Sequence, residues 1–310
     1  MRRLFDQPWV WALLGTLLLW TILSAGSGQV SIGSLSGILA SSAVLCVVAI
    51  GQMLVVTTGN GAIDLSIPNV MTLSGFLATS VINGHDGQLL SGLAVVILLG
   101  GAVGIFNALT INHLRIPPII TTLAVGYILT TGTLIFNRGF RTYAISPFLV
   151  SLVSIRIADI PLLLFFALAV SVLAYVLLHR TVYGRGLAAV GQNSDAAYLS
   201  GIRVKTTRLV AYVISGALAA LGGVLLSARV GGAFLEMGNP FLLQSVGAVV
   251  VGGSSILGGR STALGTFLGS IFLVMVVTTM QVLRLAGGLQ QVAQGVLIIL
   301  VLAVATVKRG

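Results

Sequence analysis

Charge is scarce in this sequence. Only 7% of its 310 residues are Asp, Glu, Lys or Arg, whereas 57% are hydrophobic. A soluble protein of this length needs far more polar surface to stay dispersed in water. The composition therefore excludes an ordinary soluble domain. It favours a single membrane domain over residues 1–310, which at roughly 20 residues per span has room for about ten helices.

Cysteine and lysine are scarcer still. The single cysteine, Cys46, lies within an apolar block, so a disulfide framework within the chain is excluded and packing is its expected role. The only lysines are Lys205 and Lys308, and neither stands in the G-x-x-x-x-G-K-[ST] pattern that cradles nucleotide phosphates. The chain is therefore not expected to be an enzyme that hydrolyses ATP itself. Because its three histidines are scattered, we also expect no metal and no other cofactor.

Acidic residues number only six, and the formal net charge is +10. The basic residues stand singly between apolar blocks, so we interpret them as signals of membrane topology and expect no nucleic-acid partner. With Arg2 and Arg3 placed inside, eleven of the basic residues fall inside and five fall outside. This count predicts that both termini and the segment 180–208 are cytoplasmic.

Ten apolar blocks are candidate membrane segments. They cover residues 8–23, 35–57, 66–83, 90–111, 118–136, 161–179, 208–228, 240–256, 262–283 and 289–307. The first block resembles a signal peptide, but everything downstream is also apolar, so an uncleaved first span is the preferred interpretation. The blocks 66–83 and 240–256 are short and interrupted by Gly, Pro or Ser. This interruption predicts half-helices or re-entrant segments.

An internal repeat relates the two halves of the chain. At a constant offset of 172, the region of about 36–136 aligns with 208–307. The matched pairs include Gly51 with Gly223, Gly59 with Gly231, Pro68 with Pro240, and Asp64 with Glu236. Five spans separate the equivalent blocks, and because five is odd the halves would have opposite orientations. Inverted repeats are common in transporters, whose path lies at the interface between the repeats.

The most polar long segment is Arg180–Arg208, which lies between two apolar blocks and holds five basic residues. Small residues dominate its centre: Ala188, Ala189, Gly191, Ser194, Ala196, Ala197, Ser200 and Gly201. Such a run can form a short helix with a smooth face that another protein can approach closely. We interpret the segment as a cytoplasmic docking loop. The alternative is a solvated connection whose positive charge only sets topology.

Four motifs stand in order along almost the whole chain. They are Thr58–Pro68 (TGNGAIDLSIP), Ile116–Leu123 (IPPIITTL), Gly184–Ile202 and Val249–Gly265 (VVVGGSSILGGRSTALG). Together they resemble the permease subunits of bacterial ATP-binding cassette (ABC) importers for ribose and related monosaccharides, within the branched-chain amino acid/sugar permease family. Ala62 and Ser261 stand where that family usually has glycine. These departures bear on the identity of the substrate more than on the class of transporter.

The resemblance implies an all-α permease of the type II ABC importer kind, with some broken helices, in the bacterial inner membrane. ATPase subunits would dock on the loop 180–208, and a periplasmic substrate-binding protein would deliver a monosaccharide or sugar-like solute. A second permease copy or a paralogue would complete the assembly among the membrane lipids. The implied coupling residues are Gly184, Arg185, Gly191, Asn193, Ala196, Ala197, Ser200 and Gly201. The candidate residues of the path or of a broken helix are Asn60, Gly61, Asp64, Ser66 and Glu236.

Asp64 permits two interpretations. It follows Gly59 and Gly61 and precedes an apolar block, which is where the N-cap of a helix is expected. Its carboxylate would then lie at the positive end of the helix dipole. A carboxylate inside a membrane is also costly, which favours a functional role as a path-lining acid that meets sugar hydroxyls. Glu236 leaves the same two interpretations open.

A second class of transporter also fits some of these features. An ion-coupled secondary transporter of a small polar solute also uses inverted repeats and broken helices. Proton coupling normally requires carboxylates inside the membrane, and only Asp64 and Glu236 are available, each near the end of a span. The four motifs therefore favour the importer. A pentose, a hexose, a furanose-form sugar and a signalling sugar derivative all remain open as its substrate.

Overall fold

The structure is a computed structural model that describes residues 8–27, 32–139 and 144–307. Its long helices lie where the apolar blocks predict them. They are α2 (Pro8–Ser27), α3 (Ile32–Thr57), α4 (Ile67–Ile82), α5 (Leu89–Leu114), α6 (Pro118–Arg138), α8 (Leu162–Arg180), α11 (Val204–Val230), α12 (Phe241–Val251), α13 (Ala263–Val282) and α14 (Gly287–Val307). Within the described residues, six helices are long and apolar enough to cross a membrane, and four further apolar helices are shorter. The chain is thus all-α in its membrane part, while the number of ten spans remains a prediction.

Short elements fill two connections. On one side of the bundle, η1 (Asp86–Gln88), α7 (Pro147–Ser154) and the antiparallel strands β1 (Arg156–Ile157) and β2 (Ile160–Pro161) lie together. The Asp86 carboxylate accepts hydrogen bonds from the Ser146 hydroxyl and, at 3.1 Å, from the Phe148 amide. On the opposite side, the polar segment after α8 folds into α9 (Val182–Gln192) and α10 (Ser194–Leu199).

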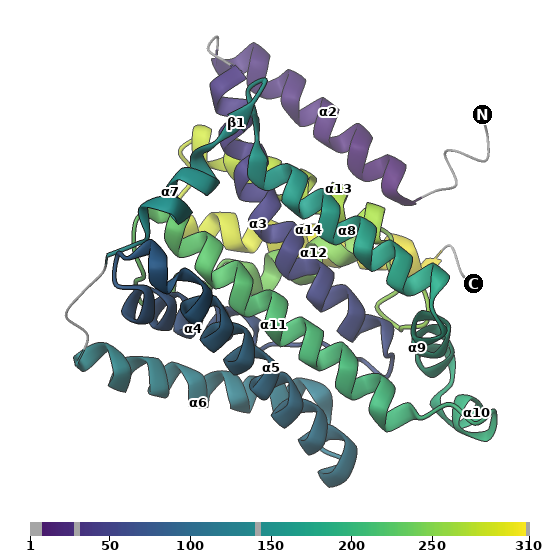
Figure 1. Cartoon of the computed structure of the whole chain (residues 1–310). Coiled ribbons are helices and arrows are strands. Elements are labelled where there is room, and N and C mark those ends of the chain that lie inside the picture. The colour runs from purple at the N-terminus through teal and green to yellow at the C-terminus, as the bar shows by residue number, and fades with distance from the viewer. Residues whose placement is uncertain (1–7, 28–31, 140–143, 308–310) are drawn as a thin grey trace.

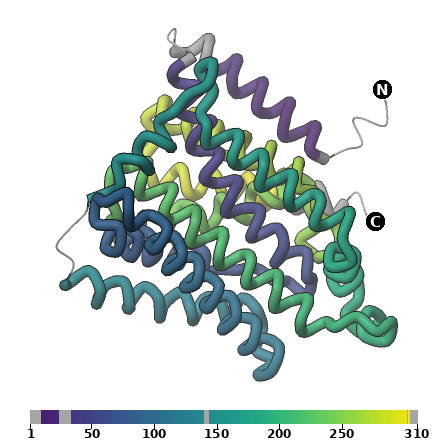
Figure 2. The backbone as a smooth tube through the Cα atoms, viewed as in Figure 1, coloured from purple at the N-terminus to yellow at the C-terminus, as the bar shows by residue number. Residues whose placement is uncertain are grey.

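These connections define two ends of the molecule, the α7 end and the α10 end. In Figures 1 and 2, the first turn of α2 and the last turn of α14 lie on the same side as α9 and α10. The sequence predicts a common cytoplasmic side for these segments. The terminal residues themselves, with Arg2, Arg3 and Lys308, lie outside the described residues.

Helices α3 and α11 form the centre of the bundle. α3 is almost entirely buried, and α11 packs along α5, α3 and α4. The crossing of α11 with α5 depends on glycine: a Cβ on Gly100 would lie 2.2 Å from the carbonyl oxygen of Gly216, and one on Gly104 would lie 2.2 Å from that of Tyr212. Helices in a membrane associate through such close backbone contact, because lipid supplies no hydrophobic driving force between them.

The contacts of the two halves follow the same order. α11 packs against α4 and α5, while α3 packs against α12 and α13. Likewise, α4 packs against α6, and α12 packs against α14. Gly59 and Gly231, which are 172 residues apart, follow the ends of α3 and α11 with φ values of 78° and 81°. The repeat of about 36–136 in 208–307 itself stays a prediction.

Candidate functional site

The connection between α3 and α4, residues 58–66, is a non-helical segment inside the bundle, which we call the α3–α4 break. Three successive residues, Gly59, Asn60 and Gly61, have φ values of 78°, 56° and 68°. Such left-handed conformations suit glycine and, to a lesser degree, asparagine, so this sequence permits a sharp reversal after α3. Pro68 occupies the first turn of α4, where a missing amide hydrogen costs nothing. The chain is therefore non-helical between α3 and α4, while the assignment of this segment to a broken helix stays a prediction.

Asp64 lies in the middle of this break and is only 2% exposed. One carboxylate oxygen accepts from the Ser66 hydroxyl at 2.6 Å and the Ser66 amide at 3.1 Å, and the other accepts from the Ser215 hydroxyl at 2.9 Å. The N-cap of α4 is Ser66, whose side chain makes no capping bond. The prediction that Asp64 caps α4 is therefore wrong: its carboxylate bonds the residue two positions on and joins the break to α11.

Other polar side chains attach the same break to its neighbours. Asn107 of α5 donates to the Ser66 hydroxyl oxygen at 3.0 Å, and Gln52 of α3 accepts from the Asp64 amide at 3.3 Å. Thr122 of α6 accepts from the Leu65 amide at 3.0 Å. A buried polar group is costly unless it is hydrogen-bonded, so this network holds the non-helical backbone inside the bundle. Asp64 and Ser66 line neither of the two large cavities described next.

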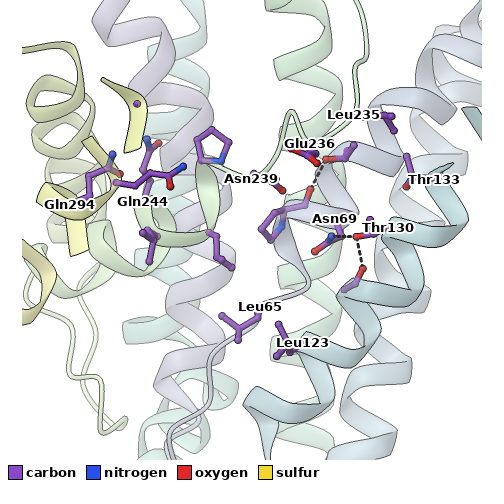
Figure 3. Close-up of a pocket in the computed structure, with 18 of the residues that line it drawn as sticks. Leu65, Asn69, Leu123, Thr130, Thr133, Leu235, Glu236, Asn239, Gln244 and Gln294 are labelled. Carbon is purple, nitrogen blue, oxygen red and sulfur yellow. Dashed lines mark hydrogen bonds between the residues drawn. The ribbon is translucent and has the colours of Figure 1, made fainter. Parts of the chain in front are cut away.

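The first cavity, of about 710 Å³, lies between the pair α4–α6 and the pair α12–α14. Its polar lining consists of amides, hydroxyls and one carboxylate: Asn69, Thr72, Tyr127, Thr130, Thr133, Glu236, Asn239, Gln244, Gln281, Gln290, Gln291 and Gln294. Figure 3 shows Asn69 and Thr130 on one side of this space and Gln244 and Gln294 on the other. Asn69 donates to the Thr130 hydroxyl oxygen at 2.6 Å. We call this space the amide cavity.

Glu236 is the one candidate path residue that lines the amide cavity. It stands in the break between α11 and α12, with a φ of 66°. Sequence reasoning missed the amides of this cavity. The available signal was the presence of five glutamines within the apolar blocks 240–256, 262–283 and 289–307, since polar side chains are costly in a membrane unless they have a role.

The second cavity, also of about 710 Å³, lies at the α10 end. Its walls come from the α3–α4 break, the turn between α5 and α6, α10, and the start of α11. We call it the basic cavity, because Arg115, Arg203, Lys205 and Arg208 line it. Asn60 faces this space rather than the amide cavity, and Gly61 lines neither. Four of the five candidate path residues are therefore divided among two cavities and a buried network, and Gly61 is exposed outside all three.

Both short helices of the segment 180–208 have side-chain caps. Thr181 accepts from the Gly184 amide at 3.1 Å at the start of α9, and Asn193 accepts from the Asp195 and Ala196 amides, each at 3.0 Å, at the start of α10. The Tyr183 hydroxyl donates to the Thr207 carbonyl oxygen at 3.3 Å and so joins α9 to α11. Burial raises the pKa of Tyr183, which keeps this hydroxyl a donor.

The coupling candidates divide into exposed residues and residues that serve the fold. Arg185, Asn193, Ala196, Ser200 and Gly201 are exposed. The side chains of Tyr198 and Leu199 beside them are 71% and 85% exposed, so α10 presents apolar surface. Gly201 has a φ of 82°, which ends α10 in a left-handed turn.

Three of the small coupling candidates are used inside the chain. Ala197 is 4% exposed, so the expectation that it meets a partner directly is wrong. A Cβ on Gly184 would lie 2.3 Å from the carbonyl oxygen of Leu177, at the turn from α8 into α9. A Cβ on Gly191 would lie 1.9 Å from the carbonyl oxygen of Thr57. The backbone at the end of α9 thus packs directly against the backbone at the end of α3.

Comparisons with known proteins agree with this architecture. The family model described as the branched-chain amino acid transport system permease component matches residues 34–302. The ribose import permease protein RbsC of Escherichia coli (strain K12) is 29% identical, over 99% of this chain and 98% of its own length. The galactose/methyl galactoside import permease protein MglC of the same strain is 30% identical, over 90% and 88%.

A further relative is the autoinducer 2 import system permease protein LsrC of Klebsiella pneumoniae, which is 31% identical over 92% of this chain and 82% of its own length. No solved structure matches the chain significantly. The family model covers most of the sequence, and the relatives span nearly all of it. This chain, a multi-pass membrane protein, therefore belongs to the branched-chain amino acid transport system permease family.

Proposed function

We propose that this chain is the membrane subunit of an ABC importer in the bacterial inner membrane and that it carries a monosaccharide or sugar-like solute. The observation that carries the substrate class is the lining of the amide cavity. Among the described residues that line it, the charged group is the single carboxylate of Glu236, and amides and hydroxyls provide the other polar contacts. Such groups both donate and accept hydrogen bonds, which suits the many hydroxyls of a neutral sugar.

The position of the amide cavity supports a role as the path. It lies between α4–α6 and α12–α14, which are the same pairs of helices in the two proposed repeats, approximately 36–136 and 208–307. The break between α11 and α12 also meets α4 beside the cavity, because the Gly238 amide donates to the Thr72 hydroxyl oxygen at 3.2 Å. Transporters built from inverted repeats bind substrate at such a junction of broken helices. We infer that the two repeats enclose the path here.

The α10 end supplies the surface for energy coupling. The polar segment 180–208 forms α9 and α10, with Tyr198 and Leu199 exposed at the tip. An exposed apolar surface on a short polar segment fits a protein partner better than it fits water. We infer that the partner is an ATPase subunit on the cytoplasmic side, since the sequence has no nucleotide-binding motif of its own. A substrate-binding protein at the α7 end and a second permease would complete the importer.

Reconstitution tests this function. The purified chain alone should neither hydrolyse ATP nor accumulate a radiolabelled sugar in proteoliposomes. Accumulation should require the ATPase, the binding protein and ATP, and it should survive a proton uncoupler. An ion-coupled secondary transporter is the second candidate, since it would also use the breaks that carry Asp64 and Glu236. Uptake by the chain alone that collapses on uncoupling would establish that candidate and refute the importer.

A further inference from the structure

The basic cavity at the α10 end has a charge that the transport of a neutral solute does not explain. Its described lining holds the four cations Arg115, Arg203, Lys205 and Arg208, against one carboxylate, that of Asp195. Arg208 is only partly exposed. Arg115, Arg203 and Lys205 are exposed, and like charges gathered around one space repel one another unless an anion compensates them. The excess of positive charge around the basic cavity therefore favours a negatively charged ligand.

Two buried polar atoms at the same cavity lack a partner within the described part of the chain. Tyr212 is 1% exposed, and its hydroxyl makes no hydrogen bond. Asn112 is 8% exposed; its amide nitrogen donates to the Lys205 carbonyl at 2.9 Å, but its side-chain oxygen accepts nothing. Buried polar groups are normally satisfied, and an unsatisfied one is costly. Both residues line the basic cavity, so a ligand there could satisfy a donor and an acceptor at once.

The backbone adds to the attraction for an anion. α6 and α11 both begin at this cavity, through Pro118 and Val204. The positive end of each helix dipole lies here, but Pro118 has no amide hydrogen and the Val204 amide donates to the Ile202 carbonyl oxygen at 2.9 Å, so the helix dipoles and not free amides supply this attraction. Arg115, at the end of α5, has a φ of 55°, a conformation that glycine or asparagine adopts more readily. Arg115 is exposed and lines this cavity.

We propose that the basic cavity binds a phosphate group that carries a neighbouring hydroxyl. The guanidinium groups of Arg203 and Arg208 match the oxygens of a phosphate, and arginine binds phosphate in a bidentate manner. The Tyr212 hydroxyl donates to a phosphate oxygen, and the Asn112 oxygen accepts from the hydroxyl of the ligand. A cavity of about 710 Å³ has the size of a small-molecule site.

Two sources present this chemistry at a cytoplasmic face. One is a soluble phosphate ester of a sugar or polyol, and the other is the headgroup of an anionic lipid such as phosphatidylglycerol. In either case the ligand would lie between α10, the start of α11 and the α3–α4 break, because Asp195, Arg208 and Asn60 all line the cavity. Binding would therefore connect the proposed coupling segment with the broken helix. The inference does not depend on which sugar is carried.

Thermal unfolding of the purified full-length chain tests the soluble source. Glycerol 3-phosphate, which has both a phosphate and hydroxyls, is the probe, with glycerol and with sodium chloride at equal ionic strength as reference solutes. We expect glycerol 3-phosphate alone to raise the unfolding temperature with a saturable dependence on concentration. Arg208→Gln should weaken the apparent Kd at least about tenfold, which is the loss that one charge-assisted hydrogen bond brings.

Two further variants make the test specific. Tyr212→Phe removes a hydroxyl that has no partner in the described chain, so it should fold as well as wild type and still weaken binding about fivefold. It keeps the proposal testable if Arg208→Gln does not fold. Arg180→Gln is the matched control: Arg180 lies at the end of α8 on the same face, is exposed, and does not line the cavity. This control should bind glycerol 3-phosphate as wild type does.

Nanodiscs distinguish the lipid source. Stabilisation in phosphatidylglycerol relative to phosphatidylcholine that is lost in Arg208→Gln and Tyr212→Phe, without any effect of soluble glycerol 3-phosphate, would assign the site to a lipid headgroup. Equal stabilisation by sodium chloride, or equal binding by wild type and both cavity variants, would overturn the proposal. Absence of binding from either source, with loss of ATPase association in Arg208→Gln, would also overturn it and assign the charges to a protein partner.

Discussion

At the scale of single residues, Asp64 is a rare acid that hydrogen bonds hold inside the bundle. Its carboxylate receives three hydrogen bonds, two from Ser66 and one from Ser215. Asp64→Leu would leave these donors buried and unsatisfied, at a cost of about 1–3 kcal/mol each. We expect a much lower unfolding temperature and a lower yield of monodisperse protein, measured by fluorescence-detected size-exclusion chromatography.

Asp64→Asn is the matched control for this prediction. The amide oxygen can still accept from Ser66, and the amide nitrogen can donate to the Ser215 hydroxyl oxygen. We therefore expect nearly normal yield and, because Asp64 does not line the amide cavity, an unchanged KM for sugar uptake. A normal yield but altered sugar preference in Asp64→Asn would instead identify Asp64 as a residue of the path.

Much of the break around Asp64 could be predicted from sequence, but its partners could not. Gly59, Gly61 and Pro68 are local signals, because their backbone preferences act within a few residues. The bond to Ser215 spans 151 positions and depends on how α11 packs beside the break. No helical or strand period carries that information, which explains why a cap was one of the two interpretations of a carboxylate that bonds Ser66 and contacts another helix.

At the scale of elements, the close contact between α9 and α3 predicts that Gly191 cannot be replaced without loss of stability. Gly191→Ala would place a Cβ 1.9 Å from the Thr57 carbonyl oxygen and 2.3 Å from the Gly259 amide nitrogen. Both are backbone atoms, which move only at a cost of about 1–3 kcal/mol or more. We expect a lower unfolding temperature and weaker coupling of ATP hydrolysis to uptake in the assembled importer.

The matched control lies in the same helix. A Cβ on Gly186 would meet only the end of the Ile202 side chain, at 3.6 Å, which is an ordinary contact. Alanine is also the better helix former by up to about 1 kcal/mol. Gly186→Ala should therefore be as stable as wild type or slightly more so. If both alanine variants behave alike, the contact between α9 and α3 is not a determinant of stability.

Two adjacent alanines of the short helix α10 allow docking on a partner to be tested separately from packing within the chain. Ala196 is exposed, whereas Ala197 is buried. Ala196→Trp should fold normally, because a surface change costs within about 0.5 kcal/mol, but it should lose the ATPase during co-purification. Ala197→Trp should lower the unfolding temperature of the isolated chain instead, because the tryptophan has no room. Wild-type assembly of Ala196→Trp, with Ala196→Ser as the size control, would leave α10 without a docking role.

Elements were predictable to the extent that each carries its own apolar block. The long helices therefore appear close to their expected bounds, for example α5 at Leu89–Leu114 against an expected 90–111. α7, at Pro147–Ser154, is too short to give such a signal, and the hairpin of β1 and β2 has only two residues in each strand. The burial of Ala197 could not be predicted either, because a run of small residues does not indicate which side of the helix faces a partner and which side packs within the chain.

At the scale of the whole molecule, the amide cavity is a product of packing between distant helices. Gln290, Gln291 and Gln294 of α14 belong to the same wall as Gln244 of α12, and Asn69 of α4 lies opposite. The sequence predicted that the path lies between two repeats, yet the individual side chains emerge only when the pairs α4–α6 and α12–α14 are placed together. A local pattern identifies an amphipathic face, but it does not identify the element that covers it.

Two adjacent threonines of α6 test whether this cavity is the path. Thr130 lines the cavity and accepts a hydrogen bond from Asn69 at 2.6 Å, whereas Thr131 is exposed outside it and donates only to the Tyr127 carbonyl of its own helix. Thr130→Val keeps the shape and removes the hydroxyl, so the Asn69 amide loses its partner and a sugar loses one contact.

The loss of one such hydrogen bond corresponds to about 0.5–1.5 kcal/mol, or a roughly two- to tenfold fall in the initial rate of uptake at low sugar concentration. Thr131→Val makes the same chemical change on the outer face of α6 and should transport as wild type does. The measurement is uptake of radiolabelled sugar by the reconstituted importer, normalised to the amount of folded permease and to ATP hydrolysis. Equal rates for the two variants would show that the solute crosses elsewhere in the assembly, and the polar lining between α4–α6 and α12–α14 would then need another explanation.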